Sequence, residues 1–232
     1  MKMSEFLTSS AYFGVILSLS AYAAGTWLRR KLRTPLANPL LISIMLTICT
    51  LLILGIEHED YSRSADILGW LLTPATTALA VPLYEQLSLL KRNLTAVLIG
   101  IGAGAISGLV SIYALSMLFG LTREQYVTLL PKSITAAIGI PVAEELGGIP
   151  AIAAGVIIIT GIFGNITAEF IFKIFRITEP IAKGIALGTS SHAIGTAKAT
   201  ELGTTEGAMS SLAIVVSGLI TTMVASVFAD LL

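Results

Sequence analysis

Residues 184–202 read GIALGTSSHAIGTAKATEL, a stretch that is too polar for an ordinary lipid-facing helix. It lies between strongly apolar segments, so it belongs to the same membrane fold as they do. The segment 188–190 is a weak point for a helix, and Ser190 or Ser191 is a good N-cap for a new one. We therefore predict a broken helix whose second half begins near Ser191. Its exposed N–H groups and the positive end of its dipole should face a protein-lined cavity.

Two earlier segments share this pattern. Residues 133–147 align without gaps on residues 189–203, and residues 76–87 align on residues 135–146. Short segments interrupted by Pro or Gly at corresponding positions indicate the binding site of a transporter. The alternative is chance similarity between helices rich in small residues. The breakers before the three copies are Thr73-Pro74, Pro131-Lys132-Ser133 and Gly188-Thr189-Ser190. The identical pairs of the first alignment are Ala137/Ala193, Ile138/Ile194, Gly139/Gly195, Ala143/Ala199, Glu145/Glu201, Leu146/Leu202 and Gly147/Gly203.

The composition is that of an integral membrane protein. Of the 232 residues, 55% are hydrophobic and only 12% are charged, and the mean hydropathy is +0.88. The formal net charge is zero, so nothing indicates a nucleic-acid partner. The single cysteine, Cys49, excludes a disulfide framework, and His58 and His192 lack the further ligands of a metal site. No nucleophile elbow accompanies the Ser-His pair, so we expect no enzymatic activity and no cofactor.

We expect an all-α polytopic protein with residues 1–232 in a single membrane domain. It should have about six full spans plus broken or re-entrant helices, up to eight segments in all. Residues 1–64 hold the first two spans, residues 65–119 the first broken segment and a span, and residues 122–172 and 184–229 are repeated units. The expected elements are, in order, the span 10–28, the span 39–56, an acidic outside loop at 57–63, the broken segment 65–90, the span 94–119, the broken segment 122–146, the span 150–172, the broken segment 184–203 and the span 207–229. In the span 94–119, Gly100, Gly102, Gly104 and Gly108 give a small-residue face suited to close helix packing.

Basic residues set the expected orientation. Basic clusters at 29–33, 91–92 and 173–183 follow hydrophobic segments, and such clusters favour the cytoplasmic side. If the broken segments 122–146 and 184–203 both cross the membrane, the last cluster faces outside, against this rule. If both are re-entrant hairpins, the cluster at 173–183 is cytoplasmic. The two hairpins then enter the membrane from opposite sides and meet near its midplane, an arrangement compatible with an elevator-like transporter. We prefer the second arrangement, and both arrangements place the two termini outside.

Lys132 and Ser133 sit at the break of the second segment. A lysine at membrane depth costs roughly 2.5–3.5 kcal/mol on insertion scales, so it usually faces a cavity and has a partner. A small carboxylate substrate is one such partner. The alternatives are that Lys132 extends to the interface or pairs with a glutamate.

Ser190, Ser191 and His192 sit at the break of the third segment, with Thr196 one turn further on. Hydroxyls and the N–H groups at a helix start suit carboxylate oxygens. His192 either bonds the substrate or carries a proton, or it is structural and bonds a backbone carbonyl.

Two further groups complete the candidate site. Thr73 and Thr76 flank the first break and Thr135 the second, as substrate contacts or only as helix caps. Glu144, Glu145 and Glu201 recur late in their half-helices, which hints at proton or sodium coupling. Interfacial placement is the more ordinary interpretation of these carboxylates.

Three motifs in order resemble the LrgB/CidB family of antiholin-like membrane proteins. They are LTPATTALAVPLY at 72–84, LPKS at 130–133 and SHAIGTA at 191–197, and the resemblance covers essentially the whole chain. It implies a bacterial inner-membrane protein, often paired with a holin-like protein of the LrgA/CidA type. It also implies one of two functions, which are transport of small monocarboxylates such as pyruvate, glycolate or glycerate, or control of murein hydrolase export and cell lysis.

Two hypotheses therefore stand. The first is a secondary transporter of small carboxylates, favoured by the repeats, the broken helices and Lys132. The second is an antiholin-like regulator that acts by assembling with a holin-like partner. Besides substrate and partner, we expect contact with membrane lipid, and a homodimer is left open.

Overall fold

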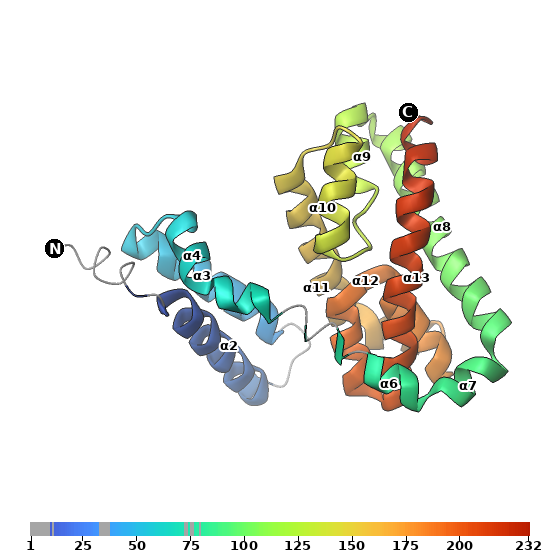
Figure 1. The fold of residues 1–232 in the computed structure, drawn as a ribbon, viewed down its shortest axis with the longest axis horizontal. Coiled ribbons are helices and arrows are strands. Elements are labelled where there is room, and N and C mark those ends of the chain that lie inside the picture. Colours follow the sequence, from blue (N-terminus) through green and yellow to red (C-terminus); the bar gives the residue numbers. More distant parts are fainter. Residues whose placement is uncertain (1–9, 11, 33–37, 72–73, 75–76, 79) are drawn as a thin grey trace. The chain divides into compact units, whose positions relative to one another are not determined.

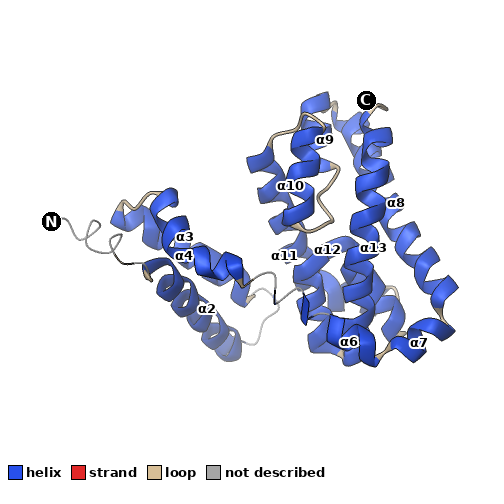
Figure 2. Ribbon diagram, in the orientation of Figure 1, coloured by secondary structure: helices blue, strands red, loops and turns tan. Residues whose placement is uncertain are grey.

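The computed structural model describes residues 10, 12–32, 38–71, 74, 77–78 and 80–232. This described part is helical, without a β-strand (Figure 2), as the sequence predicts. Three of its helices are long and apolar enough to cross a membrane: α8 (Leu94–Phe119), α11 (Pro150–Ile174) and α13 (Thr204–Ala229). The chain divides into two units, residues 1–78 and residues 79–232, which are described in turn.

The first unit contains α2 (Phe13–Leu32), α3 (Pro39–Leu54) and α4 (His58–Trp70) (Figure 1). The side chain of Asn38 caps α3 by accepting hydrogen bonds from the N–H groups of Leu40 and Leu41, at 2.9 and 3.1 Å. Two glycines let α2 approach its neighbours closely. The N–H of Gly14 donates to Ser64 Oγ on α4 at 3.0 Å, and a Cβ on Gly25 would lie 2.6 Å from the carbonyl oxygen of Pro39.

The predicted outside loop at 57–63 is wrong, because α4 begins at His58. Glu59 and Asp60 lie in the first turn, where negative charge stabilises a helix start, and Arg63 pairs with Glu59 at 3.6 Å. The hydroxyl of Tyr61 also bonds Ser18 Oγ on α2 at 2.7 Å. The polar residues that we interpreted as a loop are thus those that start and anchor a helix. Thr73 and Thr76, beside the first predicted break, lie outside the described residues.

The second unit begins with the short helices α6 (Ala80–Glu85) and α7 (Leu87–Arg92), which lead into α8. Helices α8 and α13 start at the same end of the unit and run in the same direction (Figure 1). Val97 and Ile101 of α8 pack with Met209 and Ala213 of α13 and with Ile185 of α12 (Pro180–Leu202) in one buried cluster. These two helices form the frame against which the broken segments are held.

The second predicted break is confirmed. Helix α9 (Arg123–Leu129) starts with a capping box between Thr122 and Gln125 and stops before Pro131, and α10 (Ala136–Glu145) begins only after a turn at 130–135. After α10 the chain returns to α9, where the N–H of Ile149 donates to Thr128 Oγ1 at 2.9 Å. Residues 123–148 therefore form a hairpin, here called the α9–α10 hairpin.

The third predicted break is also confirmed, but its position differs. Helix α12 (Pro180–Leu202) is interrupted at His192, whose backbone has φ 42° and ψ −135°. The chain reverses there, since a Cβ on Gly195 would lie 2.4 Å from the carbonyl oxygen of Leu187. Residues 180–191 and 193–202 are thus the two halves of an α12 hairpin.

The N-cap predicted at Ser190 is wrong. Its hydroxyl donates to the carbonyl of Ala186 at 2.7 Å, so Ser190 belongs to the last turn of the first half. Serine commonly bonds the carbonyl four residues back in a helix interior, and that bond competes with capping. The break lies at His192 because the ring of that residue is held by α11, as described below.

Candidate functional site

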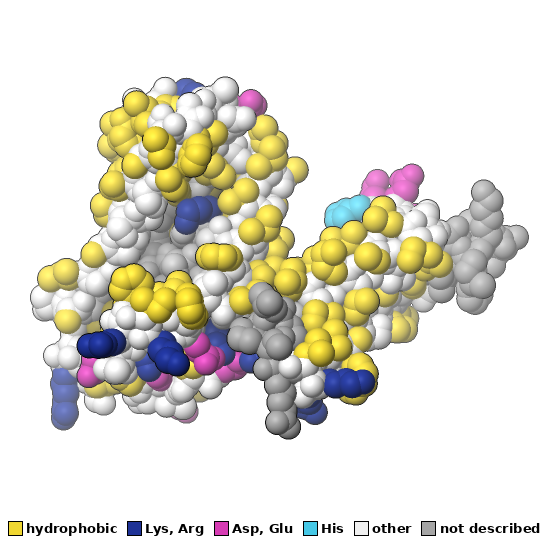
Figure 3. Space-filling model, turned by 180° about the vertical axis from the view of Figure 1, so that it is seen from behind, with side chains coloured by type: hydrophobic (Ala, Val, Ile, Leu, Met, Phe, Trp, Pro, Cys, Tyr) yellow, Lys and Arg dark blue, Asp and Glu magenta, His cyan; other side chains and the backbone are white. Residues whose placement is uncertain are grey.

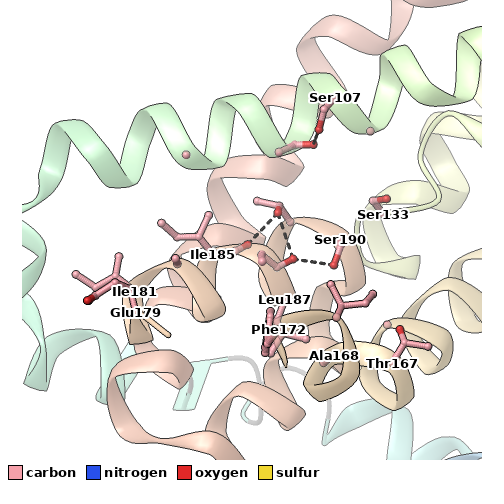
Figure 4. Close-up of a pocket in the computed structure, with 18 of the residues that line it drawn as sticks. Ser107, Ser133, Thr167, Ala168, Phe172, Glu179, Ile181, Ile185, Leu187 and Ser190 are labelled. Carbon is pink, nitrogen blue, oxygen red and sulfur yellow. Dashed lines mark hydrogen bonds between the residues drawn. The ribbon is translucent and has the colours of Figure 1, made fainter. Parts of the chain in front are cut away.

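A cavity of about 1010 Å³ lies in the second unit (Figure 4). It is bordered by α8, α11, the first half of α12 and the turn of the α9–α10 hairpin. The face of this unit seen in Figure 3 is hollowed, and charged side chains gather along its lower edge. The polar residues that line the cavity are Asn93, Ser107, Ser111, Lys132, Ser133, Thr167, Glu179, Thr189 and Ser190.

One end of the cavity combines a cation with hydroxyl groups. Lys132 is the one basic residue among the described residues that line the cavity. Its Nζ donates to Ser133 Oγ at 2.9 Å. Ser133, Ser190 and Ser107 come from the α9–α10 hairpin, α12 and α8, and they lie around the same part of the cavity (Figure 4). An ammonium group with hydroxyls beside it is suited to a carboxylate.

The opposite end lies where α8 and α12 begin. Asn93 precedes α8, and Glu179 precedes α12. Between the two ends the wall is largely apolar, with Phe172 of α11 and Ile181 and Ile185 of α12. The cavity therefore offers a cationic end at Lys132, an apolar middle and a second polar end at Asn93 and Glu179.

Ser191, His192 and Thr196 lie behind the cavity wall and do not line it. Their exposed fractions are 1%, 4% and 1%. The ring of His192 donates from Nε2 to the carbonyl oxygen of Ile157 at 2.9 Å, and Thr196 Oγ1 bonds Ser210 Oγ on α13 at 2.7 Å. A carbonyl oxygen can only accept, so Nε2 of His192 carries the proton of this bond. This geometry corresponds to the structural alternative for His192, in which the ring bonds a backbone carbonyl.

Two glycines of α11 make room for the turn of the α12 hairpin. A Cβ on Gly161 would lie 2.7 Å from Cε1 of His192, and a Cβ on Gly164 would lie 1.7 Å from Ser191 Oγ. Real Cβ atoms do not come that close to other atoms. The turn thus rests directly on the backbone of α11, which places Ser190 at the cavity wall.

The other predicted site residues are not brought to the cavity. Thr135 precedes α10 without a side-chain cap bond, and it does not line the cavity. Glu144 and Glu145 are exposed at the far end of α10. Glu201 is 3.5 Å from the ammonium of Lys198, which also contacts Glu169 of α11. Within the described chain, no group of three His, Cys, Asp or Glu side chains is arranged to hold a metal ion.

Sequence reasoning missed several cavity residues. Ser107 and Ser111 of α8, Thr167 of α11, and Asn93 and Glu179 all line the cavity. The spacing of four residues between Ser107 and Ser111, on the face that also carries Gly100 and Gly104, was a usable signal of one polar, small-residue helix face.

Comparison with known proteins places the chain in a family. Residues 18–231 match the model of the LrgB-like family. The chain belongs to the LrgB-like family. Among its relatives, the antiholin-like protein LrgB of Bacillus subtilis (strain 168) is 37% identical over 226 residues, which cover 97% of this chain and 98% of the relative. The protein of the same name from Bacillus mycoides (strain KBAB4) is 36% identical over 222 residues, covering 95% and 96%. No solved structure matches the chain.

Proposed function

We propose that this LrgB-like protein is a secondary transporter of small monocarboxylates, of the size of pyruvate, glycolate or glycerate, in the bacterial inner membrane. The observation that carries the proposal is the cavity with Lys132 at one end. A lysine is energetically costly within a membrane, and a half-buried ammonium without a carboxylate beside it is suited to bind one from solution. Among the described residues, Lys132 bonds Ser133 and pairs with no acidic side chain.

The substrate carboxylate binds between the two hairpins. Lys132 supplies the charge, and the hydroxyl of Ser133, which accepts from Lys132, donates to a carboxylate oxygen. Ser190 contributes once its hydroxyl turns from the carbonyl of Ala186 to the substrate. A charge-assisted hydrogen bond contributes on the order of 1.5–3 kcal/mol, so Lys132 should dominate the affinity. Ser191, His192 and Thr196 act indirectly, by fixing the turn that presents Ser190.

The arrangement of the hairpins supports re-entry from opposite sides. The turn of α12 lies against the middle of α11, at Gly161 and Gly164, and both of its halves pack on α13. The α9–α10 hairpin reaches the same cavity from the other end, with its start at Arg123 paired to Asp230 at 3.8 Å. The two repeated units, 122–172 and 184–229, would then be related by inversion, as in elevator-like and other transporters with inverted repeats.

The same arrangement assigns an orientation. Asn93 and Glu179 border the cavity next to the basic clusters at 91–92 and 173–183. Positive residues favour the cytoplasm, so we propose that this end of the cavity is cytoplasmic and that α13 ends on the outer side. The basic cluster at 29–33 separately favours an outside N-terminus. Further along α8, Leu109 and Ile112 pack with Tyr126 and Leu130 in a buried hydrophobic cluster. Proton or sodium coupling through Glu144, Glu145 or Glu201 would have to act at a distance from the substrate.

The test is carboxylate uptake and binding in liposomes containing the purified protein. Lys132→Ala should weaken binding more than about tenfold, because ~1.4 kcal/mol is a factor of ten. Lys132→Arg should restore it only in part, since a planar fork replaces a compact ammonium. Lys173→Ala is the matched control, because Lys173 is an exposed lysine that does not line the cavity. Normal carboxylate binding by a folded Lys132→Ala variant would contradict the proposal.

The second candidate function is an antiholin-like regulator of murein hydrolase export and lysis. The relatives from Bacillus subtilis and Bacillus mycoides are named antiholin-like proteins, which favours this function. Such a protein would act by assembly with a holin-like membrane protein of the LrgA/CidA type, and its cavity would be incidental. Reconstitution of the protein alone separates the two functions, since a transporter needs no second protein for uptake. A homodimer fits either function.

A further inference from the structure

One face of α8 borders the cavity over several turns, and Gly108 lies on that face. Positions 100, 104 and 108 all line the cavity and recur every four residues, as the residues of one helix face do. All three are glycines. The sequence alone suggests close helix packing for all of them, but their surroundings differ.

Packing explains Gly104 but not Gly108. A Cβ on Gly104 would lie 2.7 Å from Oγ1 of Thr189, so this glycine is what allows α12 to approach α8. A Cβ on Gly100 would touch Ile185 at 3.5 Å, an ordinary contact. A Cβ on Gly108 would meet no atom within 4 Å.

Glycine in the interior of a helix lowers its stability relative to alanine, because the unfolded chain loses more freedom. Gly108 lies in the interior of α8, and the structure leaves room for a side chain there. The space it leaves open belongs to the cavity. Ser107, its neighbour in the chain, lies around the same part of the cavity as Ser133 and Ser190 (Figure 4).

We propose that Gly108 is a specificity-determining residue: its missing side chain keeps open the space beside the substrate carboxylate and so admits branched groups on the neighbouring carbon. This inference rests on the proposed function. It names the part of the solute that is selected: the substituents on the carbon next to the carboxylate. A Cβ at position 108 narrows this space and meets no protein atom within 4 Å.

The experiment compares the size preference of two valine variants in liposomes. The probes are acetate, propionate, 2-methylpropanoate and 2,2-dimethylpropanoate, which differ only in the methyl groups next to the carboxylate. The measured quantity is the uptake of each branched probe divided by the uptake of acetate. Gly108→Val should lower this ratio by about tenfold or more from its value in the unsubstituted protein, since one methylene in a hydrophobic pocket changes discrimination by roughly 10–200-fold.

Gly102→Val is the matched control. Gly102 lies on the same helix, and a Cβ there also meets nothing within 4 Å, but Gly102 does not line the cavity. Its substitution has the same effect on helix propensity and should leave the ranking of the four probes unchanged. An unchanged ranking in Gly108→Val, or an equal shift in Gly102→Val, overturns the inference.

A second readout separates failure of the filter from failure of transport. Gly108→Cys and Gly102→Cys are made in a Cys49→Ala background, which has no other cysteine. A small water-soluble thiol reagent should label Gly108→Cys faster than Gly102→Cys. Absence of labelling at Gly108→Cys overturns the inference directly. Labelling at Gly108→Cys together with no carboxylate uptake by the unsubstituted protein overturns the transport proposal, and the filter falls with it. Uptake by the unsubstituted protein with an unaltered size ranking in Gly108→Val overturns the filter alone.

Discussion

The imidazole of His192 donates a hydrogen bond from Nε2 to the carbonyl oxygen of Ile157 over 2.9 Å, and this bond fastens the turn of α12 to α11. His192 also has a backbone φ of 42°, a conformation that side-chain-bearing residues seldom adopt. Such a conformation persists only where the surroundings hold it in place. The buried ring therefore stabilises a reversal that the local backbone disfavours.

We expect His192→Ala to destabilise the protein more than His192→Gly does. Both variants lose the ring and its hydrogen bond, at a cost of about 1–3 kcal/mol for a buried polar group left unpaired. Alanine keeps the unfavourable backbone conformation, whereas glycine adopts it freely. Unfolding by heat in detergent micelles measures the order of the two.

His58 provides the control for that order. It is exposed in the first turn of α4, where the backbone is helical. At a helical position alanine is better than glycine by up to about 1 kcal/mol, so His58→Ala should be the more stable member of its pair. The same order at both histidines would contradict the role given to the backbone of His192.

A second prediction concerns the contact between Gly164 and Ser191. Gly164→Ala should reduce stability strongly, because the new Cβ would lie 1.7 Å from Ser191 Oγ and 2.8 Å from Ser191 Cβ. Ser191→Gly removes both of these atoms and should restore much of the loss in the double variant. Gly155→Ala on the same helix meets nothing within 4 Å and should stabilise by roughly 0.5–1 kcal/mol. Equal effects of the two alanines on thermal unfolding would contradict the close contact.

Lys198 gives a third prediction. Its side chain is only 10% exposed, and it contacts Glu169, with Glu201 farther away at 3.5 Å. Glu169→Gln should therefore cost more stability than Glu201→Gln, by roughly 1 kcal/mol, since a buried ammonium loses its nearer charge-assisted bond. In the control pair Arg63–Glu59, whose side chains are 76% and 82% exposed, Glu59→Gln should change stability by less than about 1 kcal/mol. A larger effect of Glu201→Gln than of Glu169→Gln in chemical unfolding would show that the nearer bond is not the stronger one.

The helices and two of the breaks were predictable because they depend on local chemistry. Pro131 ends α9, Pro150 starts α11, and long, mainly apolar stretches form α8 and α13. The position of the third break was not predictable to the residue. Gly188 looks like the weak point, yet it stays helical because its missing side chain lets α12 pack on α13, where a Cβ would lie 2.5 Å from the carbonyl oxygen of Ser210.

The candidate site was predictable only in part, for a related reason. Lys132, Ser133 and Ser190 could be named because polar residues at helix breaks are unusual in an apolar chain. Which side of the break faces a cavity depends on tertiary packing. Ser191 and His192 turn toward α11, so neighbouring residues of one motif serve different purposes. The inverted relation between the two repeated units stays a prediction.

Substitution of the adjacent serines should separate binding from packing. Ser190 lines the cavity, whereas Ser191 is buried against Gly164. Ser190→Ala should weaken carboxylate binding by several-fold, or about 1 kcal/mol, but by less than Lys132→Ala, because the hydroxyl is an uncharged donor whereas Lys132 brings a full charge. Ser191→Ala should leave binding nearly unchanged. Titration of carboxylate binding in micelles measures the affinity of both variants. A larger loss of affinity in Ser191→Ala than in Ser190→Ala would place Ser191 at the substrate.

The last prediction concerns the orientation of the two hairpins. Single cysteines replacing Lys91 and Lys183 (in a Cys49→Ala background) should react with a membrane-impermeant thiol reagent only from the cytoplasmic side, because these basic positions flank the end where α8 and α12 begin. A cysteine replacing Glu124, in the first turn of α9, should react only from outside. Leu118→Cys serves as the background, since this exposed leucine lies near the end of the apolar helix α8. If the α12 hairpin crossed the membrane completely, the cluster at 173–183 would lie on the opposite side from Lys91. Labelling of Lys183→Cys from outside, with Lys91→Cys labelled from inside, would therefore exclude re-entry and with it the meeting of the two hairpins at one substrate.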